Sequence, residues 1–289
     1  FGVGNLNPLI GLILRVIGRA EKVVYVCLDY FPTRFENNFL NYIYFQLDKF
    51  CVRYCDETWN VSKAIEIARD KKMGMNSSEY KRQYTVPGGI WFYKVNRLPF
   101  KKINKKKLVY RGTLNDFMGV DLVISAMPYI LKVIPDVVFE ILGSGVEEDK
   151  LKKLTQKLDL TKNVIFHGHV GDRNELEFLL SNSALGMATF NTTILDDKVK
   201  NADPGKIKDY MSMGIPVITT NAVAYHSEII REKCGLVVDY SATKLADAVI
   251  SMLGDEKVLQ IYRNNALRFI KGFDCSRILK PNLERVLRD

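Results

Sequence analysis

Residues 201–220, NADPGKIKDYMSMGIPVITT, form the stretch that most clearly indicates the fold of this chain. Asp203 is suited to cap a helix and Pro204 to open it, so the first N–H groups of that helix would point outward beside Gly205 and Lys206. Such N–H groups at a helix start attract anions, which predicts a phosphate site here. The alternative interpretation is a well-capped amphipathic helix that binds nothing.

The predicted helix carries its charged residues on one side. Lys206 and Asp209 are three residues apart and therefore share a face, where a cation and a carboxylate would meet the same ligand. The opposite face is apolar and carries Ile207, Tyr210 and Met211. Gly214 fits the left-handed conformation that ends a helix, and residues 217–220 have the apolar character of a short buried strand.

Short apolar runs alternate with amphipathic patterns from residue 107 onward. Strands are predicted at 108–110, 137–142, 164–167, 185–188, 217–219 and 236–238. Helices are predicted between them at 120–131, 147–158, 175–181, 206–213 and 227–232. Strict alternation predicts an α/β fold with a doubly wound parallel sheet. Ligands bind beyond the carboxyl ends of such strands, and here those ends are followed by residues 111–115, 143–145, 168–172 and 189–204.

The amino-terminal part repeats this alternation in a shorter form. Strands are predicted at 23–28, 57–60 and 84–86, with helices at 38–49 and 63–70. This amounts to about half of a second doubly wound domain. Residues 98–107, with a proline and a cluster of lysines, are expected to link the two.

Positive charge is concentrated in the first part of the chain. The 289 residues carry a net charge of +9, and residues 1–107 hold 19 Lys and Arg against 9 Asp and Glu. Such a surface favours an anionic partner, either a phospholipid leaflet or a phosphate-bearing substrate. Nucleic acid is not expected, because no helix-turn-helix, zinc finger or aromatic RNA-binding signature accompanies the charge.

The cysteines and the hydropathy pattern bear on location. Five cysteines lack the spacing of metal ligands, and several lie inside apolar runs, which favours a reducing, cytoplasmic setting. No run of eighteen apolar residues is present to span a bilayer. We therefore expect a cytoplasmic protein, with peripheral contact at the inner face of an anionic membrane.

A series of segments matches one known family in order. The segments are Gly112 with 119–121, then 139–145, 164–170, 203–210 with 214–218, 227–230 and 273–274. Together they resemble the retaining nucleotide-sugar glycosyltransferases of the GT-B fold, a family that includes bacterial mannosyl- and glucosyltransferases. The resemblance covers residues 107–289. It implies two Rossmann-like domains with parallel sheets, a nucleotide-diphosphate-sugar donor, and no metal or cofactor.

The amino-terminal part resembles this family less closely. Residues 25–35, YVCLDYFPTRF, are similar to a strand end that faces the cleft, and residues 86–89, VPGG, are similar to a turn near the domain junction. The family's opening glycine loop is not found before them, so the first domain is expected to be truncated. We expect residues 1–100 to form a partial acceptor-side domain. Residues 101–289 would form the donor-binding domain, with the last helix packing back on the first.

The resemblance also implies roles for individual residues. Lys206 would hold the diphosphate and Asp209 the ribose hydroxyls, both as catalytic candidates. Further donor-binding candidates are Arg111, Gly112, Thr113, Gly143, Gly145, His169, Val170, Asn201, Asp203 and Gly205. For each of them the alternative is a cap or a surface side chain.

Two departures from the family pattern affect the donor site. The family's arginine and lysine after the first strand fall at Thr113 and Met118, so Lys206, together with Arg111, has to supply the positive charge. The family's two glutamates fall at Asn201 and Asp209, so either the first carboxylate is an amide here or its role passes to Asp203.

Asp29 is a third catalytic candidate, and Arg34 is a candidate on the acceptor side. Asp29 follows an apolar strand and is expected at the cleft, where relatives often have a histidine. It would bind donor sugar hydroxyls or orient the acceptor, unless it only caps the turn at 30–34. Arg34 is a candidate for binding an anionic acceptor, which would be a glycan, lipid-linked or otherwise.

Three other functions stay open at this point. A sugar-nucleotide epimerase has the same fold. An NAD-dependent oxidoreductase is suggested by the glycines at 143 and 145, but Glu148 falls where the third glycine belongs, and its carboxylate would repel a pyrophosphate. A nucleotide-binding subunit without catalysis would fit the substitutions at Thr113 and Met118.

Overall fold

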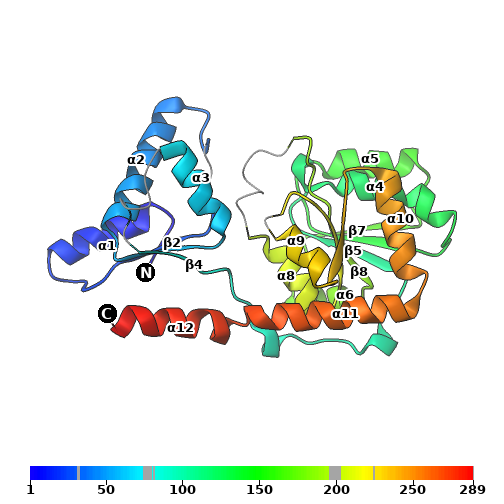
Figure 1. The fold of residues 1–289 in the computed structure, drawn as a ribbon. Coiled ribbons are helices and arrows are strands. Elements are labelled where there is room, and N and C mark those ends of the chain that lie inside the picture. Colours follow the sequence, from blue (N-terminus) through cyan, green and yellow to red (C-terminus); the bar gives the residue numbers. More distant parts are fainter. Residues whose placement is uncertain (31–32, 74–79, 81, 195–202, 224, 289) are drawn as a thin grey trace. The chain divides into compact units, whose positions relative to one another are not determined.

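The structure is a computed structural model that describes residues 1–30, 33–73, 80, 82–194, 203–223 and 225–288. The chain divides into two compact units. The first consists chiefly of Phe1–Gly89 and Cys275–Asp289, and the second of Ile90–Leu195 and Pro204–Asp274. Each unit has its own parallel sheet with helices around it (Figure 1). The predicted α/β class with two parallel sheets is confirmed.

The first unit is built on a four-stranded sheet in the order β1-β2-β3-β4. Its elements are β1 (Gly2–Val3), α1 (Leu6–Val16), β2 (Val24–Cys27), α2 (Asn38–Tyr54), β3 (Glu57–Asn60), α3 (Lys63–Met73), β4 (Arg82–Thr85) and α12 (Cys275–Arg288). All neighbouring strands pair in parallel. The predicted strands therefore lie side by side with their carboxyl ends at one edge.

β1 and α1 were not predicted from the sequence. β1 has only two residues, too few to show a period of two. α1, LNPLIGLILRV, has a narrow polar face formed by Asn7, Gly11 and Arg15, spaced four residues apart, but Pro8 and Gly11 give it a low helix propensity. Several of its apolar side chains are exposed, among them Leu6, Ile10 and Ile13.

The carboxyl-terminal helix α12 packs against the first sheet. Val286 lies in a buried cluster with Val24, Trp59 and Val86. Arg285 donates to the Glu57 carboxylate at 2.9 Å, and its guanidinium carbon lies 3.4 Å from the centre of the Tyr84 ring. Apolar contact and an ion pair thus attach the end of the chain to the unit in which it begins.

A fully buried ion pair fixes the helices of the first unit to its sheet. Arg69 on α3 donates to Asp48 on α2 at 2.8 Å, and neither side chain is exposed to solvent. Tyr25 on β2 donates to the same carboxylate at 2.6 Å, and its hydroxyl oxygen lies 2.9 Å from the Asn5 side-chain oxygen. A buried charge of this kind is tolerated only when its partners are held in place, so the network defines one arrangement of these elements.

The second unit contains a six-stranded parallel sheet in the order β10-β9-β8-β5-β6-β7. Its strands are β5 (Lys107–Arg111), β6 (Val138–Leu142), β7 (Val164–Gly168), β8 (Leu185–Ala188), β9 (Val217–Thr220) and β10 (Gly235–Val238). Its helices are α4 (Val120–Leu131), α5 (Glu148–Lys157), α6 (Arg173–Ser181), α8 (Gly205–Ser212), α9 (His226–Arg231), α10 (Ala242–Leu253) and α11 (Glu256–Ile270). α4 contacts α10, and α8 contacts α11, so helices cover both faces of the sheet (Figure 1).

Helix α8 follows the predicted pattern except at its start. Its apolar residues Ile207, Tyr210 and Met211 are fully buried. Gly214 follows the helix with a φ of 75°, in the left-handed conformation expected of it. The predicted cap at Asp203 is wrong: the helix begins at Gly205, and the Asp203 carboxylate instead accepts a hydrogen bond from the Gly88 amide at 2.7 Å. That amide lies in the turn after β4, which competes for the carboxylate.

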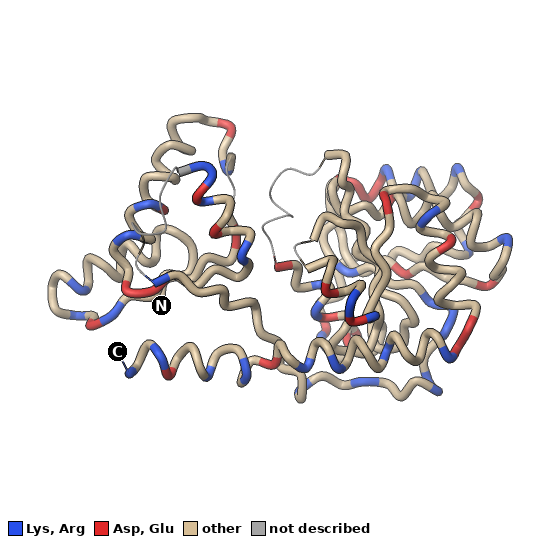
Figure 2. Tube along the Cα trace, viewed as in Figure 1, with Lys and Arg blue, Asp and Glu red and all other residues tan. Residues whose placement is uncertain are grey.

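Most of the surplus positive charge of residues 1–107 lies in residues 90–107, which belong to the second unit. Residues 90–107 contain seven Lys and Arg and no Asp or Glu, whereas residues 1–89 hold 12 basic against 9 acidic residues. The segment runs along α11, since Lys105 pairs with Glu256 and the Leu98 carbonyl accepts from Arg263. Its start bonds to the turn after α11, where the Ile90 amide donates to the Phe273 carbonyl. Figure 2 shows lysines and arginines along this segment.

Within the described residues, none of the helices is both long and apolar enough to cross a bilayer.

Candidate functional site

A cavity of about 540 Å³ opens at the carboxyl edge of the second sheet. The loops after β5, β6 and β7 line it together with the start of α8. The predicted site residues among its lining are Arg111, Gly112, Thr113, Gly143, His169, Val170 and Lys206. Three of the loops expected to face a ligand therefore come together in space.

Two glycines give the cavity its shape. Gly143 has a φ of 152°, and a Cβ there would lie 1.9 Å from the Gly112 carbonyl oxygen. Gly112 has a φ of 143°, and a Cβ there would lie 3.2 Å from the Lys206 amine. The N–H groups of both glycines are already used inside the loops, with Leu142 and Gly168 as acceptors. Their contribution is therefore to bring two backbones and a lysine close together.

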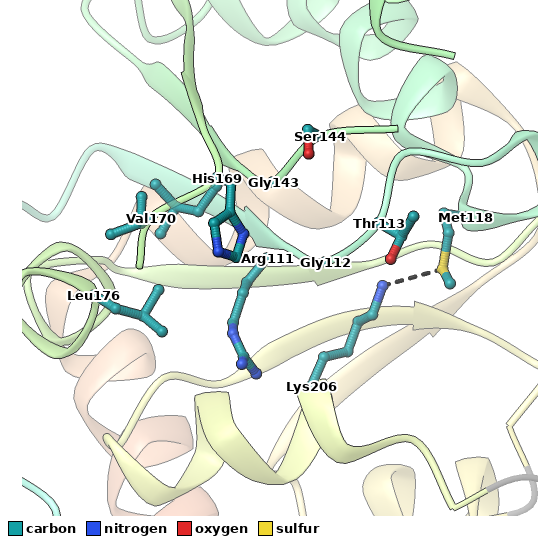
Figure 3. Close-up of a pocket in the computed structure, with 11 residues that line it drawn as sticks. Arg111, Gly112, Thr113, Met118, Gly143, Ser144, His169, Val170, Leu176 and Lys206 are labelled. Atoms are coloured by element: carbon teal, nitrogen blue, oxygen red, sulfur yellow. Dashed lines mark hydrogen bonds between the residues drawn. The ribbon is translucent and has the colours of Figure 1, made fainter. Parts of the chain in front are cut away.

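Lys206 ends in the cavity beside aromatic and sulfur groups. Its Nζ lies 3.2 Å from the Tyr110 hydroxyl and 3.2 Å from Met118 Sδ, as Figure 3 shows for the methionine. The same atom lies 4.3 Å from the centre of the Tyr110 ring and 5.2 Å from that of Phe190. Burial, together with the positive charge of nearby Arg111, lowers the pKa of Lys206 to about 7. An anion in the cavity would relieve both effects.

Arg111 forms an ion pair with Asp209 at the edge of the cavity. The Tyr210 hydroxyl accepts a hydrogen bond from the Arg111 backbone N–H at 2.7 Å, which fixes the end of β5 against α8. Burial raises the pKa of the Asp209 carboxyl, and the Arg111 guanidinium opposes that shift. Two cations, Arg111 and Lys206, thus face one cavity, and Asp209 lies one turn along the helix from Lys206.

The remaining predicted donor residues lie apart from the cavity lining. Gly145 packs against Leu114, and Gly205 is exposed at the start of α8. Asp203 lies with the first unit, bonded to Gly88. Asn201 lies outside the described residues.

Asp29 and Arg34 line a second cavity, which belongs to the first unit. It measures about 660 Å³ and lies beyond the ends of β1 and β2. The two side chains form an ion pair of 3.5 Å, each being roughly half exposed. The Arg34 guanidinium carbon also lies 5.5 Å from the centre of the Tyr44 ring. The lining is otherwise mostly apolar and includes Leu28, Phe35, Leu40 and Ile43.

Sequence reasoning missed several residues that line the cavity of the second unit or surround Lys206. Tyr110 and Phe190 lie around the Lys206 amine. In the sequence Tyr110 is part of an apolar strand, and Phe190 follows the end of another. Ser144 and Leu176 also line the cavity. Ser144 lies between two predicted glycines and could have been inferred from them, whereas nothing in the sequence marks Leu176.

A family model described as "Glycosyl transferases group 1" matches residues 96–269. The chain is 25% identical over 191 residues to an uncharacterized glycosyltransferase of Haemophilus influenzae, covering 65% of this chain and 48% of that protein. It is 24% identical over 171 residues to a poly(glycerol-phosphate) alpha-glucosyltransferase of Bacillus subtilis, covering 58% of this chain and 24% of that protein. The matched region thus spans about half the length of the first relative and a quarter of the second.

Solved structures share the fold. HepE from Anabaena, crystallised with UDP, superposes with a TM-score of 0.79 at 16% identity, covering 100% of this chain and 79% of HepE. A sucrose-phosphate synthase from Thermosynechococcus elongatus gives 0.73 at 18% identity, covering 99% and 72%. The predicted GT-B-like architecture is confirmed by these likenesses, which at such identities concern the fold alone.

Proposed function

This chain belongs to the glycosyl transferases group 1 family, and we propose that it transfers a sugar from a nucleotide diphosphate donor to an acceptor with retention. One observation carries the proposal: Lys206 and Arg111 face the same cavity from a helix start and a strand end, with Asp209 beside them. A nucleotide diphosphate supplies the anion and the hydroxyls that this arrangement suits.

The proposed chemistry follows from the placement of positive charge. When the sugar–phosphate bond breaks, negative charge grows on the departing diphosphate, and cations fixed in advance stabilise it most effectively. Lys206 supplies one cation, and the start of α8 adds the partial positive charge of its N–H groups. Arg111 supplies a second cation where Thr113 and Met118 do not. The cavity volume of about 540 Å³ is in the range of small-ligand sites.

The remaining donor contacts follow from the same cavity. Asp209 would accept hydrogen bonds from the ribose hydroxyls, since carboxylates are strong acceptors. His169 and Val170 would border the base. HepE has been crystallised with UDP-glucose, and the Bacillus subtilis relative is named an alpha-glucosyltransferase, which supports UDP-glucose as the first donor to test.

For the acceptor, the cavity of the first unit is the proposed site. Asp29 and Arg34 would meet the polar group of the acceptor, and the apolar lining favours one that also carries an apolar part. A glycan on a lipid carrier has both. During sugar transfer, Asp29 would bind hydroxyl groups of the donor sugar or orient the acceptor.

Thermal stabilisation by nucleotides and donor turnover test the proposal together. UDP or GDP should raise the unfolding temperature of the chain, because a ligand that binds only the folded state stabilises it. Lys206→Ala should remove most of that rise, whereas Lys157→Ala, at an exposed lysine on α5, should leave it intact. UDP released from UDP-glucose should require Lys206 as well.

Four outcomes would contradict the assignment. Equal stabilisation of the wild type and Lys206→Ala would remove the phosphate site. A larger effect of NAD than of UDP or GDP would favour an oxidoreductase. A new sugar nucleotide formed without any acceptor would favour an epimerase. Nucleotide binding without release of UDP from any donor would favour a subunit that binds without catalysing.

A further inference from the structure

The second unit carries an exposed surface that combines aromatic rings with positive charge. Trp91 is 55% exposed and Tyr93 is 67% exposed. Lys94 Nζ lies 4.5 Å from the centre of the Trp91 ring, and Lys271 Nζ lies 5.9 Å from that of Tyr93. We call the following exposed residues the aromatic–basic surface: Trp91, Tyr93, Lys94 and Lys271.

Contacts with the residues that follow α11, and with the end of α8, hold this surface in place. The Ile90 amide donates to the Phe273 carbonyl at 2.9 Å, and the Phe92 amide donates to the Asp274 carboxylate at 3.1 Å. Arg97 donates to the Ser212 and Phe92 carbonyl oxygens. The exposed rings therefore project from a backbone that is tied to the body of the unit.

We propose that the aromatic–basic surface docks on an anionic phospholipid leaflet. Residues 90–107 contain no acidic residue, so their positive charge is not offset within the segment. Lysines near such a leaflet are attracted to its surface charge. Tryptophan and tyrosine favour the boundary between water and lipid, because their rings are apolar and each carries one polar N–H or O–H group. The two preferences coincide on this surface.

Three lysines at the carboxyl-terminal end of the segment form ion pairs. Lys105 pairs with Glu256 at 2.7 Å and Lys106 with Asp136 at 2.6 Å. Lys107 is almost fully buried and pairs with Glu140 at 2.7 Å. These contacts neutralise the carboxyl-terminal end of the segment, and exposed positive charge remains at the aromatic–basic surface and at Lys101 and Lys102.

A single-stranded nucleic acid is the main competing occupant, since it also binds to aromatic and basic groups. Bases stack on open ring faces. Here ammonium groups already lie over both rings, Lys94 over Trp91 and Lys271 over Tyr93. The arrangement therefore favours lipid headgroups over bases. The proposal does not depend on sugar transfer.

Co-sedimentation of the full chain with vesicles tests this. Vesicles of phosphatidylcholine and phosphatidylglycerol should sediment the chain at low ionic strength and release it at high salt, and vesicles of phosphatidylcholine alone should leave it in solution. The double variant Tyr93→Ala/Lys271→Glu should bind at least about tenfold more weakly, because each charge near the surface is worth roughly a factor of five.

A matched control lies on α4. Tyr129 is 46% exposed, and Lys132 Nζ lies 5.7 Å from the centre of its ring. Tyr129→Ala/Lys132→Glu makes the same chemical change and alters the net charge equally, yet should bind vesicles like the wild type. Equal weakening by both variants, or by neither, would overturn the proposal. So would preferential binding to a single-stranded oligonucleotide that the Tyr93→Ala/Lys271→Glu variant abolishes.

Discussion

Arg111 and Asp209 are 98 residues apart in the sequence and form an ion pair at the mouth of the donor-side cavity. Arg111 ends β5, and Asp209 lies in the middle of α8. In the proposed complex this ion pair would break. The Arg111 guanidinium would bind the diphosphate, and the Asp209 carboxylate would bind the ribose. The ion pair therefore competes with the donor for both residues.

This relationship predicts different ligand dependences for the two residues. Arg111→Gln should weaken UDP binding by about tenfold or more, the usual effect of losing a charged hydrogen-bond donor. It should leave uridine binding unchanged or slightly tighter, because Asp209 is then released. Calorimetric titration with both ligands measures this, with Arg268→Gln at an exposed arginine of α11 as the control. Parallel losses for UDP and uridine would exclude a role for Arg111 at the phosphates.

The role proposed for Asp209 predicts sensitivity to the ribose hydroxyls. Asp209→Asn should weaken UDP more than it weakens 2′,3′-dideoxy-UDP, because a site built to bind hydroxyl groups loses most when either partner is removed. The two dissociation constants can be compared in one competition assay. If the variant lowers both affinities by the same factor, the carboxylate does not recognise the ribose.

The lowered pKa of Lys206 predicts proton uptake on nucleotide binding. With a pKa of about 7 in the unliganded protein, Lys206 is mostly neutral at pH 8, and a bound diphosphate would favour its charged form. UDP affinity should therefore fall as the pH rises through 7. Titration calorimetry at pH 8 in two buffers of different ionisation enthalpy should show uptake of protons. Lys206→Met should show much less uptake, and the same uptake in both proteins would disprove the linkage.

The same residue predicts a cost in stability. The pKa of Lys206 is about 7 in the folded protein, against 10.5 for an ordinary lysine, so the unfolded chain binds this proton more tightly. The contribution of Lys206 to stability therefore rises with pH between these values and is least favourable below pH 7. Lys206→Met should raise the unfolding temperature at pH 6 and have less effect at pH 10. A variant less stable than the wild type at pH 6 would contradict this.

The buried ion pair of the first unit predicts a large penalty for removing one partner. Asp48→Asn should lower the free energy of unfolding by about 3–5 kcal/mol, because Arg69 would remain charged and buried. Replacing both residues with apolar ones should cost less than this single change. Trp59 fluorescence in a Trp91→Phe background reports the first unit during urea unfolding, because the chain has only two tryptophans. A loss below 1 kcal/mol for Asp48→Asn would show that the pair is dispensable.

The sheet of the second unit was predictable because its strands are apolar runs between polar turns. The predicted strand at 185–188 matches β8, and the one at 164–167 falls one residue short of β7. β1 and α1 were not predictable in this way. A two-residue strand has no measurable period. In α1 the polar face is narrow, and Pro8 and Gly11 lower the helix propensity of the segment.

The cavity was predictable at the residues that come from strand ends and from the helix start, such as Lys206, Arg111 and Gly143. Contacts between distant side chains were not. Nothing in the sequence pairs Arg111 with Asp209 or places Met118 beside Lys206, because those contacts depend on the tertiary fold. The predicted cap at Asp203 failed for the same reason, since the Gly88 amide is distant in the sequence and takes the carboxylate.

The contact between Gly112 and Gly143 also limits how the pocket can be changed. With a Cβ at Gly143 only 1.9 Å from a neighbouring carbonyl oxygen, both positions should be left unvaried in a library made to alter donor choice. Variation should be directed to Thr113, Ser144 and Leu176, which also line the cavity. New specificities would then be found among a few side chains around an unchanged pair of glycines.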